Sequence, residues 1–274
     1  MPDAPDAQPD LAGFVRRHDP DRFLCTLFAP APRRPALFAL LAYNHEIARA
    51  REAATNPIAA LIRLQWWREA VEEAAEGRPA RRHEVAGPLH AALASGALDP
   101  RDLLALADAR EMEMEEGGMP TRGAFGAYLR ATAGGLATAM GRALGVEGAA
   151  LPALQRIGAC YGLAGVLRSL PAHAAQGRCL LPRDALEEAG LSAEAVVTEP
   201  ARAAPLRRAL AEEGGAMLRA ALEVVLPRAA LPVALSAVLA RRDLARLAAG
   251  REVPAPRGLG DRLAVTWAGL RGRV

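Results

Sequence analysis

The stretch RPALFALLAYNHEIA, residues 34–48, predicts a long and largely buried helix. Four of its side chains recur at spacings of four, three and four residues and so share one helical face: Leu37, Leu41, Asn44 and Ala48. Prolines at positions 30, 32 and 35 precede this helix, and Asn56-Pro57 ends it and begins the next one. The next helix repeats the pattern, with an expected core stripe of Leu61, Leu64, Trp67 and Val71.

Helical patterning continues along almost the whole chain, broken by proline, glycine and Asp-Pro pairs. Further helices are expected at residues 11–17, 22–28, 58–76, 88–93, 101–116, 122–144, 151–170, 183–188, 205–226, 231–249 and 261–270. No stretch alternates apolar and polar residues as a strand does, and no internal repeat is visible. The sequence therefore predicts an all-α protein, with a flexible leader at residues 1–10 and one helical domain at residues 11–274.

The composition narrows the functional classes. Aromatic residues make up only 4% of the 274 positions, so alanine and leucine must fill most of the core, through close helix contacts. Small residues at 132–137 favour such close packing, although they would also admit a ligand. A net charge of +3 is too small to indicate nucleic-acid binding. The three cysteines, Cys25, Cys160 and Cys179, match no metal or redox spacing, which favours buried thiols in a reducing compartment.

The chain is expected in the cytoplasm, with at most peripheral contact to the inner membrane. It begins with acidic residues and prolines, the reverse of a signal peptide, and its longest apolar run is too short to span a bilayer. The segment at 206–226 is amphipathic, which either membrane contact or burial in the core explains.

Familiar catalytic motifs are absent from the sequence, and one acidic cluster stands out. His45-Glu46 begins like a zinc-protease helix, but Arg49 stands where the second histidine would be needed. Asp108, Glu111 and Glu115 fall on one face of an expected helix and could share a cation, but a solvated helix face is the favoured interpretation, because hard cations need several converging oxygens.

Three stretches taken in order resemble the squalene/phytoene synthase family. The first runs from Arg22-Phe23-Leu24 to the helix at 34–48, the second is LQWWRE at 64–69, and the third is YGLAGVLR at 161–168 followed by GRCLLPRD at 177–184. The resemblance covers nearly the whole chain and implies a helical isoprenoid-synthase fold around a central cavity. In active members, two acidic motifs on facing helices hold magnesium ions against prenyl diphosphates, because the leaving diphosphate must be neutralised.

This sequence departs from the family at both acidic motifs. The positions matching the first read Ala48-Arg49-Ala50-Arg51-Glu52, with His45 in place of a family arginine. Those matching the second read Ser169-Leu170-Pro171-Ala172-His173, and Gly162 and Gly165 replace polar residues one to two turns earlier. Arg168, Gly177, Arg178, Leu181 and Pro182 still match the family. The residues expected around the former site are Asn44, His45, Ala48, Arg49, Glu52, Gly165, Arg168, Ser169, His173 and Arg178.

Such a degenerate pattern is similar to one subfamily, which includes the mitochondrial assembly factor for respiratory complex I. The matching segments are Asn-x-Glu-Ile-Ala at 44–48 and Leu-Arg-x-x-Pro-x-His at 167–173. The resemblance implies a non-catalytic protein without a cofactor, which binds a respiratory-complex subunit, another protein, or an isoprenoid-like lipid. The arginines would either bind an anion without metal or form internal ion pairs.

Two alternatives to this assembly role remain. An active head-to-head prenyltransferase would need Mg²⁺, which Asp108, Glu111 and Glu115 would have to hold. A helical module that binds a lipid or a partner protein would need no chemistry at all.

Overall fold

The computed structural model describes residues 10–54, 56–114 and 118–274, and these contain helices but no strand. The predicted all-α class is therefore confirmed. The first half of the chain forms α1 (Leu11–His18), α2 (Pro20–Thr26), η1 (Ala31–Arg33), α3 (Arg34–Ala48), α4 (Pro57–Ala75), α5 (Ala86–Ala94), α6 (Pro100–Ala109), η2 (Arg110–Met114), α7 (Arg122–Leu129), η3 (Arg130–Gly134) and α8 (Gly135–Ala143).

The second half of the chain forms the remaining helices. They are α9 (Ala150–Arg168), α10 (Leu170–Ala175), α11 (Arg183–Glu188), α12 (Ala193–Thr198), η4 (Pro200–Ala203), α13 (Ala204–Ala221), η5 (Arg228–Ala230), α14 (Leu231–Ala234), α15 (Ser236–Ala248) and α16 (Leu259–Arg271). The predicted leader falls almost entirely on residues 1–9, which lie outside the described residues.

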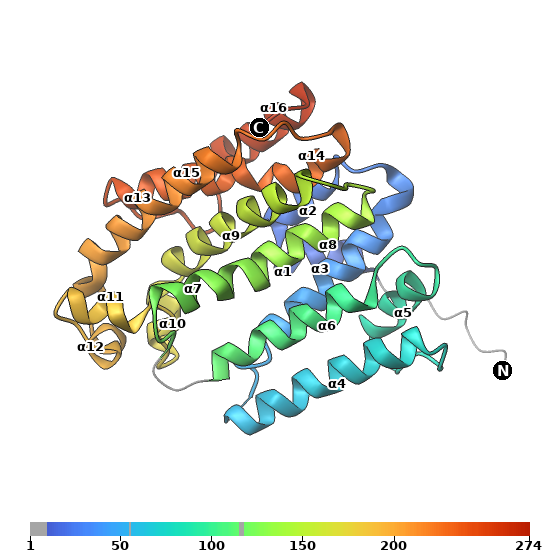
Figure 1. Cartoon of the computed structure of the whole chain (residues 1–274), viewed down its shortest axis with the longest axis horizontal. Helices are drawn as coiled ribbons and strands as arrows, with labels where there is room; N and C mark the ends of the chain where they lie inside the picture. Colours follow the sequence, from blue (N-terminus) through green and yellow to red (C-terminus); the bar gives the residue numbers. More distant parts are fainter. Residues whose placement is uncertain (1–9, 55, 115–117) are drawn as a thin grey trace.

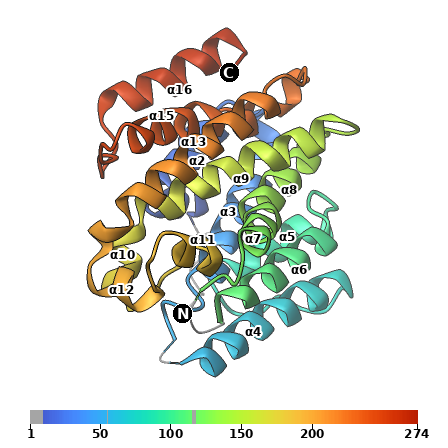
Figure 2. The ribbon, with the colours of Figure 1, turned by 60° about the vertical axis from the view of Figure 1, so that its left-hand side comes forward.

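The helices are arranged so that the two halves of the chain enclose α9. Figure 1 places α4 and α6 on one side of the molecule and α13, α15 and α16 on the opposite side, with α3, α7, α8 and α9 between them. Figure 2 shows the same order from another direction, with α10, α11 and α12 together at one end. One hydrophobic cluster, in which alanine and leucine are abundant, runs through this arrangement.

Several helix starts follow from short polar side chains that satisfy free backbone amides. The Asp19 carboxylate accepts a hydrogen bond from the Arg22 amide at 3.0 Å, and the Asn56 side chain accepts one from the Ala59 amide at 2.9 Å. Proline follows directly in both cases, where its missing N–H costs no helical hydrogen bond. The predicted helix start at Asn56-Pro57 is therefore confirmed, and Asp19-Pro20 begins α2 in the same way.

The small residues at 132–137 lie where η3, a π-helical turn, packs against α9. A Cβ atom added at Gly158 would stand 2.5 Å from the Ala133 carbonyl oxygen, and one at Gly134 would stand 2.7 Å from that of Gln155. Only glycine permits so close an approach of two helix backbones. Close helix packing, rather than an opening for a ligand, is what these small residues provide here.

Some local expectations were wrong. Leu61 is 37% exposed, whereas Leu64, Trp67 and Val71 are buried as expected, because the buried face of α4 continues to Ala60 instead. The short helices α10 and α12 were not predicted. The apolar face of α13 is buried in the core, which explains its amphipathic pattern. None of the described helices combines the length and hydrophobicity needed to cross a bilayer.

Candidate functional site

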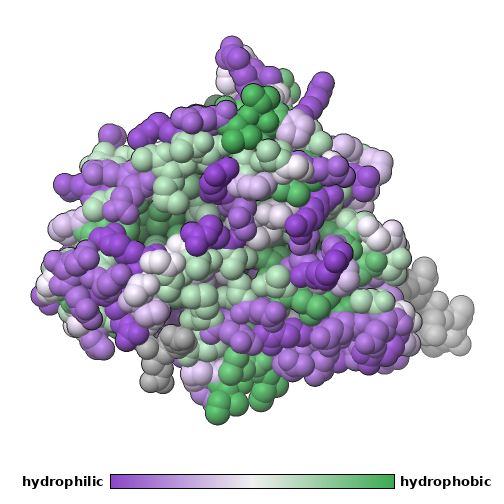
Figure 3. Space-filling model, in the orientation of Figure 1, coloured by the Kyte–Doolittle hydropathy of each residue, from purple (hydrophilic) through white to green (hydrophobic). Residues whose placement is uncertain are grey.

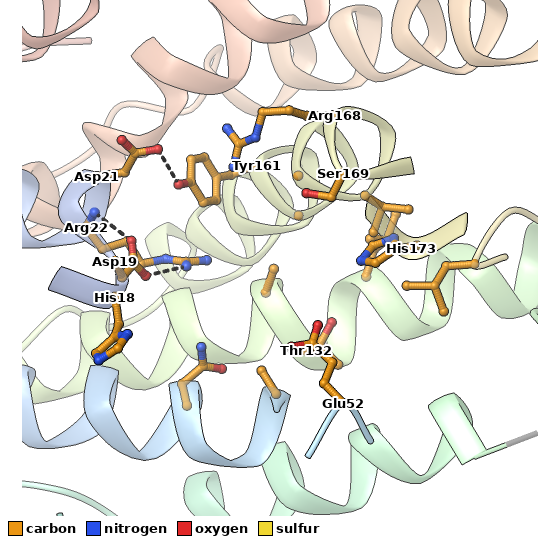
Figure 4. A pocket seen from close by; sticks show the side chains of 18 of the residues that line it. His18, Asp19, Asp21, Arg22, Glu52, Thr132, Tyr161, Arg168, Ser169 and His173 are labelled. Atoms are coloured by element: carbon orange, nitrogen blue, oxygen red, sulfur yellow. Dashed lines mark hydrogen bonds and ion pairs between the residues drawn. The ribbon is translucent and has the colours of Figure 1, made fainter. Parts of the chain in front are cut away.

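A cavity of about 460 Å³, here called the central cavity, lies between the ends of α3 and α9. Its wall is completed by the corner between α1 and α2, by η2 and η3, by α10 and by the loop at residues 254–257. Figure 4 shows side chains from these separate elements converging on one space. Of the ten residues predicted to surround the family's site, eight line this cavity: Asn44, Ala48, Glu52, Gly165, Arg168, Ser169, His173 and Arg178.

The other two predicted residues, His45 and Arg49, are not part of the cavity wall. The His45 ring instead packs 4.5 Å from the His18 ring and 5.4 Å from the Phe14 ring, measured between centroids. Burial, helped by the positive charge of Arg49, lowers the pKa of His45 to about 4, so its imidazole is neutral at pH 7. Arg49 is exposed at the end of α3, and Arg51 lines a neighbouring cavity of about 440 Å³.

Glu113 forms the centre of a buried ion-pair cluster on one wall of the central cavity. Its carboxylate accepts hydrogen bonds from Arg110 Nη1 at 2.8 Å, Arg178 Nη2 at 2.9 Å and the Tyr128 hydroxyl at 2.8 Å. Burial alone raises the pKa of Glu113, but the charges and hydrogen bonds of Arg110 and Arg178 outweigh it and hold the pKa below its usual value. Arg110 also donates from Nη2 to Asn44 Oδ1, at 3.3 Å.

Glu113 was not predicted at the site, because one regular helix was expected through residue 116. The chain instead tightens into the 3-10 turn η2 from Arg110 onward. Side chains three residues apart eclipse one another in such a turn, which brings Glu113 directly over Arg110 and turns it inward. A change of helix type, rather than of residue type, therefore decides which acidic side chain reaches the cavity.

A second buried cluster joins the loop at 254–257 to α2 and α15. Arg257 donates from Nε to Asp21 at 2.6 Å and from Nη2 to Asp243 at 2.7 Å. Arg168, a predicted cavity residue, binds the same Asp243 carboxylate at 3.0 Å, and the Tyr161 hydroxyl donates to Asp21 at 2.9 Å. Asp243 is fully buried, so the arginines supply the charge compensation that water would otherwise give.

Asp19 and Arg22 form a separate ion pair at the corner between α1 and α2. The Arg22 Nη1 atom lies 2.9 Å from Asp19 Oδ2, and the Arg22 guanidinium stacks 4.6 Å from the centre of the Tyr161 ring. Figure 4 shows this pair and the Asp21–Tyr161 hydrogen bond on the same side of the cavity. Each arginine of the cavity wall thus binds a carboxylate; the five are Arg22, Arg110, Arg168, Arg178 and Arg257.

Glu52, Ser169 and His173 differ from these clusters, because they face the cavity outside the ion-pair network. Within the part of the chain that the structure describes, no ion pair involves Glu52, which is exposed after the end of α3. The Nδ1 atom of His173 is buried without a hydrogen-bond partner among the described residues. Burial and then the charge of Arg178 lower the pKa of His173, which favours its neutral form.

The alternative acidic cluster lies outside the central cavity. Asp108 and Glu111 are both exposed, and both bind Arg68 of α4; the distance from Asp108 to Arg68 Nε is 2.6 Å. Neither belongs to the cavity wall, and Glu115 lies outside the described residues. Among the residues that the structure describes, no three histidine, cysteine or acidic side chains are grouped closely enough to hold a metal ion.

Comparison with known proteins identifies the family. A family model described as squalene/phytoene synthase matches residues 15–267. The chain belongs to this family. The match includes every residue that lines the central cavity, so the predicted resemblance is confirmed.

Curated relatives of this chain carry the name of an assembly factor. The chain is 29% identical over 194 residues to "NADH dehydrogenase (ubiquinone) complex I, assembly factor 6" of Rattus norvegicus, which covers 70% of this chain and 58% of the relative. The protein of the same name from Homo sapiens is 29% identical over 182 residues, covering 66% of this chain and 54% of the relative. The chain therefore spans just over half the length of these relatives.

Solved structures of synthases share the fold. A dehydrosqualene synthase crystallised with a ligand gives a TM-score of 0.78 at 12% identity, covering 95% of this chain and 94% of that one. Squalene synthase HpnC from Alicyclobacillus acidocaldarius gives 0.69 at 18% identity, covering 88% and 94%. These TM-scores establish a common helical architecture. At identities this low, the chemistry has to be argued from the residues of the site.

Proposed function

We propose that this chain acts without catalysis, as a scaffold in the assembly of respiratory complex I. The assembly role is supported by the relatives named complex I assembly factor 6, and the absence of catalysis is supported by the side chains around the central cavity. The proposed partner is a subunit of the complex. We place the protein in the cytoplasm, in peripheral contact with the inner membrane.

The observation that carries the non-catalytic half of the proposal is the engagement of the cavity carboxylates. Magnesium requires several converging oxygen ligands in near-octahedral geometry. Asp19, Asp21 and Glu113 already accept charged hydrogen bonds from arginines, so a cation would have to displace a guanidinium from each. The remaining cavity carboxylate is Glu52, which alone cannot complete such a shell. The donor set therefore does not fit the magnesium cluster of active family members.

The residues at the positions that match the family's two acidic motifs also support the proposal. At the end of α3 the cavity is lined by Ala48 and Glu52, and at the α9–α10 junction by Ser169 and His173. The pKa of His173 is lowered, so it stands there as a neutral imidazole beside the positive charge of Arg178. A cavity of about 460 Å³ would still accept one apolar, isoprenoid-like chain, and we include such a lipid as a cargo of the proposed scaffold.

The experiment is to measure pyrophosphate release from farnesyl and geranylgeranyl diphosphate, with and without Mg²⁺, together with binding of both by calorimetry. We expect no release, and binding that is absent or indifferent to Mg²⁺. Magnesium-dependent release would overturn the proposal in favour of a head-to-head prenyltransferase. The variant Glu52→Gln sharpens the test, because Glu52 is the cavity carboxylate that forms no ion pair among the described residues, so the substitution breaks none of the ion pairs seen there.

The assembly half is tested separately in the host cell. Deleting the gene should deplete fully assembled complex I on a native gel and leave its free subunits. Complementation with Glu52→Gln should restore the complex as well as the unaltered gene does. Complex I that assembles normally after deletion would refute the assembly role, whatever the pyrophosphate assay shows.

A further inference from the structure

Helix α16 turns an apolar face outward. Leu259, Leu263, Trp267 and Leu270 are 76%, 66%, 59% and 74% exposed, respectively. Their spacings of four, four and three residues align them on one side of the helix. Figure 3 shows a hydrophobic area at the top of the molecule, where Figure 1 places α16. Scattered exposed leucines are ordinary on a protein surface, but a continuous stripe on one helix marks a contact surface.

The opposite face of α16 attaches the helix to the rest of the protein. Val265 and Asp261 are buried, and Asp261 accepts hydrogen bonds from Arg242 and Arg246 of α15 at 2.5 and 2.7 Å. Gly269 lies so close to Phe28 that an added Cβ would stand 2.3 Å from its ring. The inward face therefore fixes the helix in place, and the exposed stripe is not needed to hold α16 against the fold.

Arginines border the stripe on both sides. At 100° per residue, Arg271 lies on one edge of the stripe and Arg262 lies on the other, and Arg273 follows the end of the helix. The Arg271 guanidinium stacks 4.6 Å from the centre of the Trp267 ring, and Arg241 stands beside the helix on α15. Among the described residues these four arginines form no ion pair with a carboxylate, unlike the arginines of the central cavity.

We propose that α16 is an interfacial helix that binds the surface of an anionic lipid bilayer. Leucines and a tryptophan on one face, with arginines at its borders, suit burial to the level of the headgroups while the guanidiniums reach the phosphates. Cationic side chains near such a surface each add favourable electrostatic energy. None of the described helices crosses the bilayer, so this contact is peripheral.

The charge of this face argues against a second copy of the chain as its occupant. A twofold dimer through α16 would place Arg262 and Arg271 of one copy opposite the same face of the other. No exposed carboxylate on α16 offsets them, because Asp261 is buried and already paired. An anionic surface is complementary to the stripe and to its borders at the same time.

The test is flotation of the purified full chain with two kinds of vesicle, one of phosphatidylcholine alone and one with about 30% phosphatidylglycerol. We expect binding to the anionic vesicles that falls as the salt concentration rises, because surface charge is screened. The variant Leu263→Ser/Trp267→Ser should weaken that binding about 10- to 100-fold, from the apolar burial lost at two side chains. Arg262→Gln/Arg271→Gln should reduce the preference for anionic lipid, and an unchanged preference would contradict the role of these arginines.

The matched control uses the other exposed apolar area, at the start of α4. Figure 3 shows this area at the bottom of the molecule, and it contains Ile58 and Ile62. Ile58→Ser/Ile62→Ser removes similar exposed surface and should leave vesicle binding unchanged. Equal loss in both variants, or no binding by the unaltered chain, would overturn the proposal. A dimer that the α16 variant dissociates, without vesicle binding, would overturn it in favour of self-association.

Discussion

Replacing Glu113 by glutamine tests whether the ion pairs of the central cavity are internal supports of the fold. The substitution keeps the shape of the side chain but leaves Arg110 and Arg178 facing a neutral amide, inside the protein. The Glu113 side chain is only 5% exposed, so water cannot replace the lost charge. Removing one partner of such a buried pair typically costs about 3–5 kcal/mol. For a chain of this size we expect the melting temperature to fall by roughly 6–15 °C.

The assay is urea unfolding at pH 7 followed by circular dichroism, with the exposed pair Asp108–Arg68 as control. Asp108→Asn removes a carboxylate from an arginine on the surface and should cost at most about 1 kcal/mol. The pKa of Glu113 is lowered in the folded state, so its contribution is present above the usual glutamate pKa and is lost as the pH falls further. The variant should therefore lose less stability in acid than the unaltered chain. A loss below about 1 kcal/mol at pH 7 would refute the reasoning.

Two further predictions concern single residues near the cavity. Gly158→Ala should destabilise the fold by about 1–3 kcal/mol, because the added Cβ would meet the Ala133 carbonyl. Gly165→Ala should stabilise it by about 0.5–1 kcal/mol, because a Cβ added there meets nothing within 4 Å. Thermal unfolding of the two variants measures both changes. The unfolding free energy should fall between pH 6.5 and about 4, because the unfolded chain protonates His45 while the folded chain holds it neutral. His45→Leu should flatten that pH dependence in urea titrations, and an unchanged slope would contradict the assignment.

Much of the fold was predictable, because helix periodicity and helix ends depend on residues that are close together in the sequence. The α3 stripe of Leu37, Leu41 and Asn44 is buried as expected, and the Asn56 cap stands where the sequence placed it. The long helical segments at 101–116 and 122–144 were predicted, but the turns η2 and η3 that interrupt them were not. The π-helical turn η3 and the 3-10 turn η2 depend on packing against α9 and on the Arg110–Glu113 pair, which no local pattern reveals.

The residues of the candidate site likewise divide into those that a local motif predicts and those that only tertiary contacts bring together. Asn44, Arg168 and His173 were found through the family resemblance, because their motifs are continuous in the sequence. Asp21, Asp243 and Arg257 were missed, because they come from α2, α15 and a loop that the sequence does not connect. Their partnership is a tertiary contact across more than two hundred residues for Arg257 and Asp21, and a single sequence carries no signal for it.

A scaffold and an enzyme place different demands on one fold, and that difference makes the two proposals separable. An enzyme of this family must keep carboxylates free to bind metal, although unpaired buried charges destabilise the folded state. A scaffold has no such requirement, so the pairing of Glu113 with Arg110 and Arg178 is compatible with the proposed role. Its specific contacts then belong to the surface. Cavity variants should accordingly change stability while leaving vesicle binding intact, and α16 variants should do the reverse.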